Sequence, residues 1–98
     1  MSYKTEFPDY DGELYIPDGF IDTSWHNDIM PHVSMIRQTA DGNEIVYNIW
    51  QDYVNKNLRE YENTKRYAFA IVVNEEYVFE KTTDDLEVIK ELVGGIYI

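Results

Sequence analysis

Side chains able to do acid–base or metal chemistry crowd into one stretch of the chain, residues 22–32, which reads Asp-Thr-Ser-Trp-His-Asn-Asp-Ile-Met-Pro-His and holds both histidines. A histidine beside a carboxylate can act as a general base, with the carboxylate fixing its tautomer. His26 with Asp28 or Asp22 is therefore the candidate catalytic set. Nitrogen and oxygen side chains also suit a metal ion, and His26, Asp28 and His32 are the candidate ligands.

The same stretch has a purely structural interpretation. Short polar side chains in loops usually hydrogen-bond to nearby backbone groups. On this interpretation Asp22, Ser24, Asn27 and Asp28 cap turns, while His26 satisfies backbone groups beside the tryptophan. The spacing His-x-Asp-x-x-x-His matches no motif of known mechanism. We therefore favour the structural interpretation over catalysis or metal binding, and we expect no cofactor.

The two tryptophans, Trp25 and Trp50, offer an aromatic surface for a ligand. Trp50 falls within a predicted strand and is expected in the core, whereas Trp25 is the better candidate for lining a cleft. Asp52 and Arg59 follow that strand, where they either orient a polar ligand or form an ion pair that holds the loop at 55–64. We favour the ion pair. The candidate binding residues are Trp25, His26, Asn27, Asp28, Trp50, Asp52 and Arg59.

Two β-hairpins are predicted to position these side chains. Apolar and polar residues alternate through 32–53 around the turn signal Asp41-Gly42. A second alternating stretch, 65–81, reverses near Asn74-Glu75. Residues 13–16 could add a short edge strand, the rest of 1–31 reads as mostly irregular, and 55–64 reads as a loop or a single helical turn.

One helix is predicted over residues 83–93. Thr83 suits the N-cap, and the acidic residues after it suit the positive end of the helix dipole. Leu86, Ile89, Leu92 and Val93 recur at helical spacing and form an apolar stripe. Gly94-Gly95 is expected to end the helix, which leaves 96–98 as a short strand or tether.

The predicted fold is α+β, an antiparallel four- to five-stranded sheet of two hairpins in a meander, with the C-terminal helix packed on one face. The small side chains of Ala68 and Ala70 predict the face on which that helix packs. The irregular residues 1–31 are expected to cover the other face. A chain of 98 residues buries one core, so we expect a single domain over 1–98.

The composition limits the possible classes of function. Nineteen acidic against eight basic residues give a formal charge of −11, which repels nucleic acid and anionic membranes and suits a basic partner. Four of the basic residues, Lys56, Arg59, Lys65 and Arg66, cluster in the middle of the chain. The chain has no cysteine, no visible signal peptide and no apolar run long enough for a bilayer, so a soluble cytoplasmic protein is expected.

The stretch Asp22-Thr23-Ser24-Trp25-His26-Asn27-Asp28, with Pro31 after it and Trp50-Gln51-Asp52-Tyr53 later, carries a resemblance. It resembles a family of small bacterial proteins known only as hypothetical or uncharacterised, with an Asp-x-Ser-Trp-His-Asn-Asp-x-x-Pro-Ser core. The Arg-Glu pair of that family would be Arg59-Glu60, and His32 departs from its serine. The resemblance runs from about Phe20 to about Val93, and it implies a compact domain with an ordered polar segment and no particular activity.

Together these features predict a small binding or accessory protein whose partner is a basic protein surface or a small polar ligand. An enzyme or metal protein that uses His26 with Asp28 is one alternative. An acidic inhibitor that imitates nucleic acid is another, and direct binding of nucleic acid or membrane is not expected. If Tyr77-Val78-Phe79 lies on a sheet edge, it could pair two copies into a homodimer.

Overall fold

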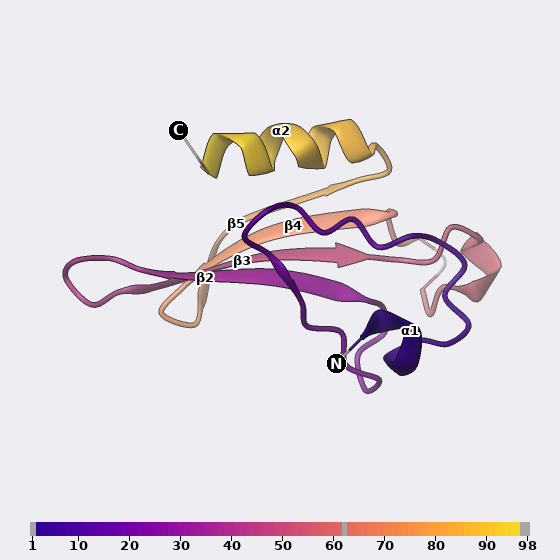
Figure 1. The fold of residues 1–98 in the computed structure, drawn as a ribbon. Helices are drawn as coiled ribbons and strands as arrows, with labels where there is room; N and C mark the ends of the chain where they lie inside the picture. The colour runs from indigo at the N-terminus through magenta and orange to yellow at the C-terminus, as the bar shows by residue number, and fades with distance from the viewer. Residues whose placement is uncertain (1, 62, 97–98) are drawn as a thin grey trace.

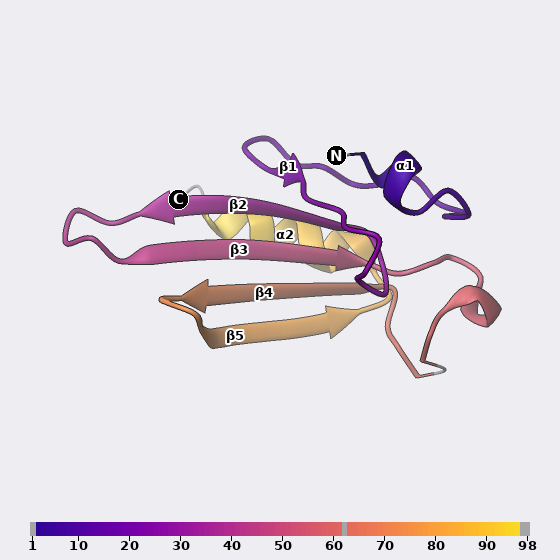
Figure 2. The same cartoon turned by 90° about the horizontal axis from the view of Figure 1, so that it is seen from below.

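The computed structural model describes residues 2–61 and 63–96. It is a five-stranded antiparallel sheet in the order β1-β2-β3-β4-β5, with one long helix, α2, lying across one face (Figures 1 and 2). Because each strand pairs with the next one in the chain, the sheet is a meander. The predicted α+β fold is confirmed. The elements are α1 (Tyr3–Glu6), β1 (Ile21–Asp22), β2 (His32–Gln38), β3 (Glu44–Gln51), the 3₁₀ turn η1 (Lys56–Leu58), β4 (Tyr67–Val73), β5 (Glu76–Thr83) and α2 (Leu86–Ile96).

Both predicted hairpin turns are confirmed, and each uses the left-handed backbone region. Gly42 has a φ of +87° in the β2–β3 turn, which glycine adopts without steric cost. Asn74 and Glu75 have φ values of +49° and +72° in the β4–β5 turn, as two-residue hairpins require. The Asn74 side chain also accepts a hydrogen bond from the Glu44 N–H at 3.0 Å, which joins the two hairpins.

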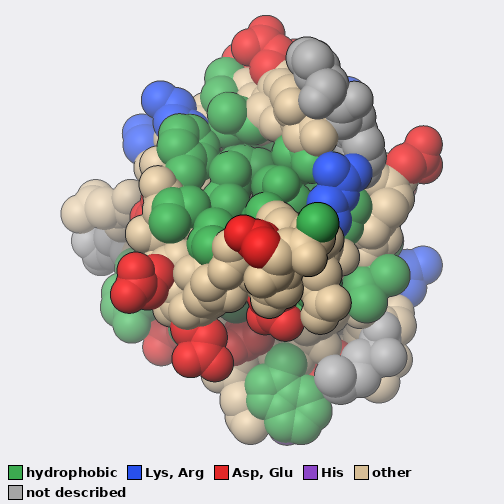
Figure 3. Space-filling model, turned by 90° about the vertical axis from the view of Figure 1, so that its left-hand side faces the viewer, with side chains coloured by type: hydrophobic (Ala, Val, Ile, Leu, Met, Phe, Trp, Pro, Cys, Tyr) green, Lys and Arg blue, Asp and Glu red, His purple; other side chains and the backbone are tan. Residues whose placement is uncertain are grey.

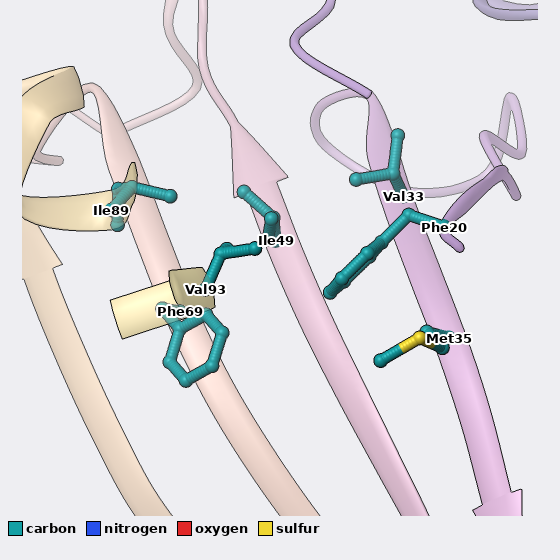
Figure 4. Packing of buried hydrophobic residues seen from close by; sticks show 7 residues of the cluster. All are labelled: Phe20, Val33, Met35, Ile49, Phe69, Ile89 and Val93. Atoms are coloured by element: carbon teal, nitrogen blue, oxygen red, sulfur yellow. The ribbon is translucent and has the colours of Figure 1, made fainter. Parts of the chain in front are cut away.

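The core lies between the sheet and α2 (Figure 4). Val33, Ile49 and Phe69 stand opposite one another in the register of β2, β3 and β4, so they share one face. Ile89 and Val93 of α2 pack onto them. Burying each large apolar side chain stabilises the fold by about 1.5–3 kcal/mol before the entropy cost is subtracted.

The ends of α2 differ from the prediction. The Asp85 carboxylate accepts a hydrogen bond from the Glu87 N–H at 2.9 Å and so caps a helix that begins at Leu86, while Thr83 is still in β5. The expected stop at Gly94-Gly95 was wrong, because the helix continues to Ile96, which packs against the core. That packing outweighs the low helix propensity of glycine. Ile96 is therefore helical and not part of the predicted strand or tether. The rest of that prediction, residues 97–98, lies outside the described residues.

The sheet face that α2 covers was also predicted wrongly. The helix packs on the side of Phe69 and Ile71, whereas Ala68 lies on the opposite side with Trp50 and Met30. The alanines alternate with larger β4 side chains, and the larger set buries more apolar area against the helix. Small side chains therefore do not mark the helix-covered face in this protein.

The N-terminal residues cover parts of both faces. Leu14, Tyr15 and Phe20 pack against the same core as α2, whereas residues 27–30 lie on the other face with Trp50 and Ala68. The expectation that 1–31 covers the other face therefore holds for only part of this segment. The expected strand at 13–16 does not form. Instead, Tyr15 is held by the buried side chain of Gln51, whose Oε1 accepts the Tyr15 N–H at 2.8 Å and whose Nε2 donates to the Tyr15 carbonyl at 2.7 Å.

The last strand, β5, is an edge of the sheet. Tyr77 and Val78 on this strand are 65% and 60% exposed. A β-bulge interrupts its pairing with β4 near Ile71 and Val72, and bulges of this kind blunt edge-to-edge association. Pairing of two copies along β5 stays a prediction.

Candidate functional site

His26 lies on an exposed turn and is not joined to the carboxylates predicted to assist it. Its Nδ1 is 3.1 Å from Glu6 Oε1, and its ring lies 4.2 Å from the ring of Trp25. The two oxygens of Asp22 instead accept the N–H groups of Tyr3 at 2.7 Å and Ser24 at 3.0 Å. The candidate catalytic set is therefore not assembled, and Asp22 holds the N-terminal turn against β1.

His32 is the more constrained of the two histidines. Its Nε2 lies 2.7 Å from Asn48 Oδ1, its Nδ1 lies 2.8 Å from Thr23 Oγ1, and its ring stacks on Trp50 at 4.0 Å. Since the Asn48 amide oxygen can only accept, the neutral imidazole carries its proton on Nε2 and accepts from Thr23. Burial lowers the pKa of His32, against the opposing influence of the Asn48 hydrogen bond and the Asp28 carboxylate.

We expect His32 to make stability depend on pH. Its folded pKa is below the unfolded value of about 6.5, so on acidification the unfolded chain binds a proton first. The free energy of unfolding should therefore decrease as the pH falls from about 6.5 towards the lower folded pKa. Urea unfolding at about pH 7 and about pH 5 should show this decrease in the wild type and less of it in His32→Gln.

His26→Gln is the matched control for this measurement, because it removes the exposed histidine and should keep the decrease. A folded-state NMR titration of the His32 ring with a midpoint at or above about 6.5 would contradict the expectation.

The candidate metal ligands His26, Asp28 and His32 are not brought together. Both ring nitrogens of His32 are already engaged by Thr23 and Asn48. Within residues 2–61 and 63–96, no three histidine, cysteine, aspartate or glutamate side chains are grouped so that they could hold a metal ion.

A pocket of about 360 Å³ lies on the sheet face opposite α2; we call it the Trp50 pocket. His32, Trp50 and Ala68 are opposite one another in register, and the small Ala68 side chain leaves room beside the indole. Asp28 supplies the carboxylate of the pocket. Its lining consists of Asn27, Asp28, Ile29, Met30, Trp50 and Ala68.

Three of the predicted binding residues, Asn27, Asp28 and Trp50, therefore meet in one place. Trp50, which was expected in the core, lines the pocket, whereas Trp25, the candidate for lining a cleft, is 41% exposed and outside this lining. Alternation along β3 places Trp50 on the face of the sheet away from α2. The large size of its side chain did not indicate which of the two faces it would occupy.

Backbone hydrogen bonds hold the loop that forms one wall of this pocket. The Thr23 N–H donates to the His32 carbonyl at 2.9 Å, and the buried Ser24 hydroxyl accepts the His32 N–H at 3.1 Å. At the other end, the Gln51 N–H donates to the Pro31 carbonyl at 3.0 Å. The loop is thus fixed to β2 and β3, which positions Asp28 beside Trp50.

Asp52 and Arg59 lie away from the Trp50 pocket and do not form the predicted ion pair among the described residues. Arg59 instead donates to the carbonyls of Tyr53 and Thr64, each at 2.7 Å, and so closes the loop between them. Asp52 is buried and accepts the Tyr53 N–H at 2.8 Å, and burial raises the pKa of its carboxyl group. The loop at 55–64 is thus held by Arg59, as predicted, but through hydrogen bonds to backbone carbonyls instead of an ion pair with Asp52.

A second pocket, of about 540 Å³, was not expected from the sequence; we call it the basic pocket. It lies beside the start of α2, on the helix side of the sheet. The cluster of basic residues between 56 and 66 was the signal that could have located it. Its lining consists of Val54, Lys56, Arg59, Arg66, Tyr67, Asp84 and Leu86.

A third hollow, of about 360 Å³, opens between the C-terminal half of α2 and the sheet. Figure 3 shows hydrophobic side chains gathered on this end of the molecule. Among the described residues that line this hollow, no acid, base or nucleophile occurs apart from the Tyr47 hydroxyl, so these residues offer no acid–base pair for chemistry. Its lining consists of Tyr47, Phe69, Ile71, Phe79, Leu92, Gly95 and Ile96.

Among the described residues, no helix has the length and apolar character needed to span a bilayer. No known family model, curated protein or solved structure matches this chain. The resemblance to uncharacterised bacterial proteins therefore stays a prediction, and any argument about function rests on the pockets themselves.

Proposed function

We propose that this protein is a non-enzymatic binding protein that holds a lysine or arginine side chain of a basic partner in the Trp50 pocket. The observation that supports this most directly is the combination of an indole ring with the Asp28 carboxylate in one concave lining. A cation over the face of tryptophan gains about 0.5–2 kcal/mol, depending on its desolvation. A carboxylate at the same place adds a charge-assisted hydrogen bond.

The rigidity of the pocket supports the same proposal. Trp50 is stacked on His32, and His32 is held through both of its nitrogens. The indole therefore loses little conformational freedom when a ligand binds, which favours affinity. Ile29, in the same lining, is 37% exposed and offers apolar area that a partner could bury.

The net charge of −11 supports a basic partner over an acidic one. A surface with a net charge of one sign associates faster with partners of the opposite charge and repels partners of the same charge. The catalytic alternative has less support, because Asp22 is engaged by backbone N–H groups and His26 pairs with Glu6.

The test is a fluorescence titration with a short lysine- and arginine-rich peptide. In Trp25→Phe, Trp50 is the only indole, so a saturable change in its emission reports on the pocket. Asp28→Asn should weaken binding about tenfold, since a charge-assisted hydrogen bond contributes about 1.5–3 kcal/mol. Binding should also weaken as salt is added.

Glu60→Gln is the matched control, because it removes one negative charge from an exposed position outside the pocket lining. Equal weakening by Asp28→Asn and Glu60→Gln would indicate general charge attraction and contradict the proposal. Trp50 emission that does not change at low salt would contradict it as well. Binding of arginine amide as tightly as the peptide would assign the pocket to a small cationic ligand instead of a protein partner.

A further inference from the structure

The basic pocket concentrates positive charge in a strongly acidic chain. Three of its lining residues, Lys56, Arg59 and Arg66, belong to a set of only eight basic residues in a chain of net charge −11. Among the described residues Asp84 is the one carboxylate in the lining, and it already accepts the backbone N–H of Arg66 at 2.9 Å and lies 3.5 Å from Lys65 Nζ. The pocket therefore keeps an excess of cationic groups.

Arg66 is the residue that points to a ligand. It is only 9% exposed, and its Nη1 is buried with no hydrogen-bond partner in the described part of the chain. Nor does it take part in any of the ion pairs among those residues. The Asp52 carboxylate, whose Oδ2 is likewise buried without a hydrogen-bond partner among the described residues, acts on Arg66 electrostatically but does not bond to this N–H. A buried guanidinium with an unpaired N–H costs stability, and an oxyanion in the pocket would supply the missing acceptor.

The guanidinium groups in the pocket are fixed in advance. Arg66 lies over the ring of Tyr67 at 4.6 Å and over the ring of Tyr10 at 5.8 Å. Arg59 donates to three backbone carbonyls, through Nε to Tyr53, Nη1 to Thr64 and, at 3.4 Å, Nη2 to Val54. Of its five N–H donors, one on each Nη is then left for a ligand. Lys56 is exposed and adds a charge that can move towards a ligand.

The remaining lining residues, Val54, Tyr67 and Leu86, are apolar or aromatic. We propose that the basic pocket binds a small organic anion, with its carboxylate or phosphate group at Arg66 and Lys56 and an aromatic or aliphatic body against Val54, Tyr67 and Leu86. The volume of about 540 Å³ falls within the range of small-molecule sites.

This site is separate from the Trp50 pocket. Tyr67 is opposite Gln51 on the helix side of the sheet, whereas Ala68, the next residue of β4, lines the Trp50 pocket on the other side. The two pockets share no lining residue, so either proposal can fail without the other.

The test is an NMR titration of the ¹⁵N-labelled protein with phenyl phosphate, benzoate and the neutral benzyl alcohol. We expect saturable shifts of the Lys56, Arg66 and Tyr67 amides with at least one anion and none with the alcohol. The tighter of the two anions identifies phosphate or carboxylate as the group recognised. Lys56→Gln should weaken binding about tenfold, the effect of losing one charge-assisted contact.

Lys81→Gln is the matched control, because Lys81 is an exposed lysine on β5 outside the basic pocket, and its loss should leave binding unchanged. The proposal is overturned by the absence of saturable shifts at these amides, by equal shifts with benzyl alcohol, or by equal weakening in the two lysine variants. Inorganic phosphate that binds as tightly as phenyl phosphate would overturn the assignment of an apolar body. Arg66→Lys is a supplementary variant. If this variant does not fold, the comparison of Lys56→Gln with Lys81→Gln decides the result.

Discussion

Phe69→Ala is expected to lower the free energy of unfolding by about 3–5 kcal/mol, the cost of emptying a large aromatic site in a packed core. Phe69 is 1% exposed at the centre of the sheet, in register with Ile49 and in the same core cluster as Val93 of α2. Domains of this size are stable by only about 5–15 kcal/mol, so this one change removes a large part of the margin.

Phe79→Ala is the matched control, because Phe79 is the same residue type on β5, touches Phe69 edge to face at 6.2 Å and is 42% exposed. It should cost about 1–2 kcal/mol, since much of its area stays in water in the native state. Urea unfolding followed by tryptophan emission measures both variants. Equal decreases in the free energy of unfolding of the two variants would show that the core between the sheet and α2 is not packed around Phe69 as described.

Gln51→Leu is expected to cost about 2–4 kcal/mol, although leucine has a similar size. Gln51 is fully buried, and its amide satisfies both the N–H and the carbonyl of Tyr15. Leucine would leave these two backbone groups without partners, and each unpaired buried group costs about 1–3 kcal/mol. The N-terminal residues would then lose their direct connection to β3.

Gln38→Leu, at the exposed end of β2, is the matched control and should change stability by less than about 0.5 kcal/mol. Hydrogen exchange locates the effect, because the Tyr15 amide should exchange faster in Gln51→Leu while amides in the centre of β4 keep their protection. An unchanged Tyr15 exchange rate would argue against this hydrogen bond as the link.

The Trp50 pocket and the basic pocket show why a short polar motif was a poor guide to the candidate binding sites. Residues 22–32 hold the densest chemistry in the sequence, yet Asp22 and Ser24 serve backbone N–H groups there. Polar side chains close together in a sequence compete for nearby backbone, and hydrogen bonds of this kind form more readily than a catalytic pair. The residues that line the basic pocket come from segments far apart, as Val54, Arg66 and Leu86 do, and the Trp50 pocket joins residues 27–30 to Trp50 and Ala68.

The strands of the two hairpins and their turns were predictable from the sequence, because alternation and turn chemistry act over a few residues and need no distant partner. The turns at Gly42 and Asn74-Glu75 are the clearest cases. Three features depend on tertiary packing instead: which side of β4 meets α2, how far the helix continues past Gly94, and which tryptophan lines the Trp50 pocket. An alternating strand offers two faces, and the choice between them depends on the total area that distant elements bury together.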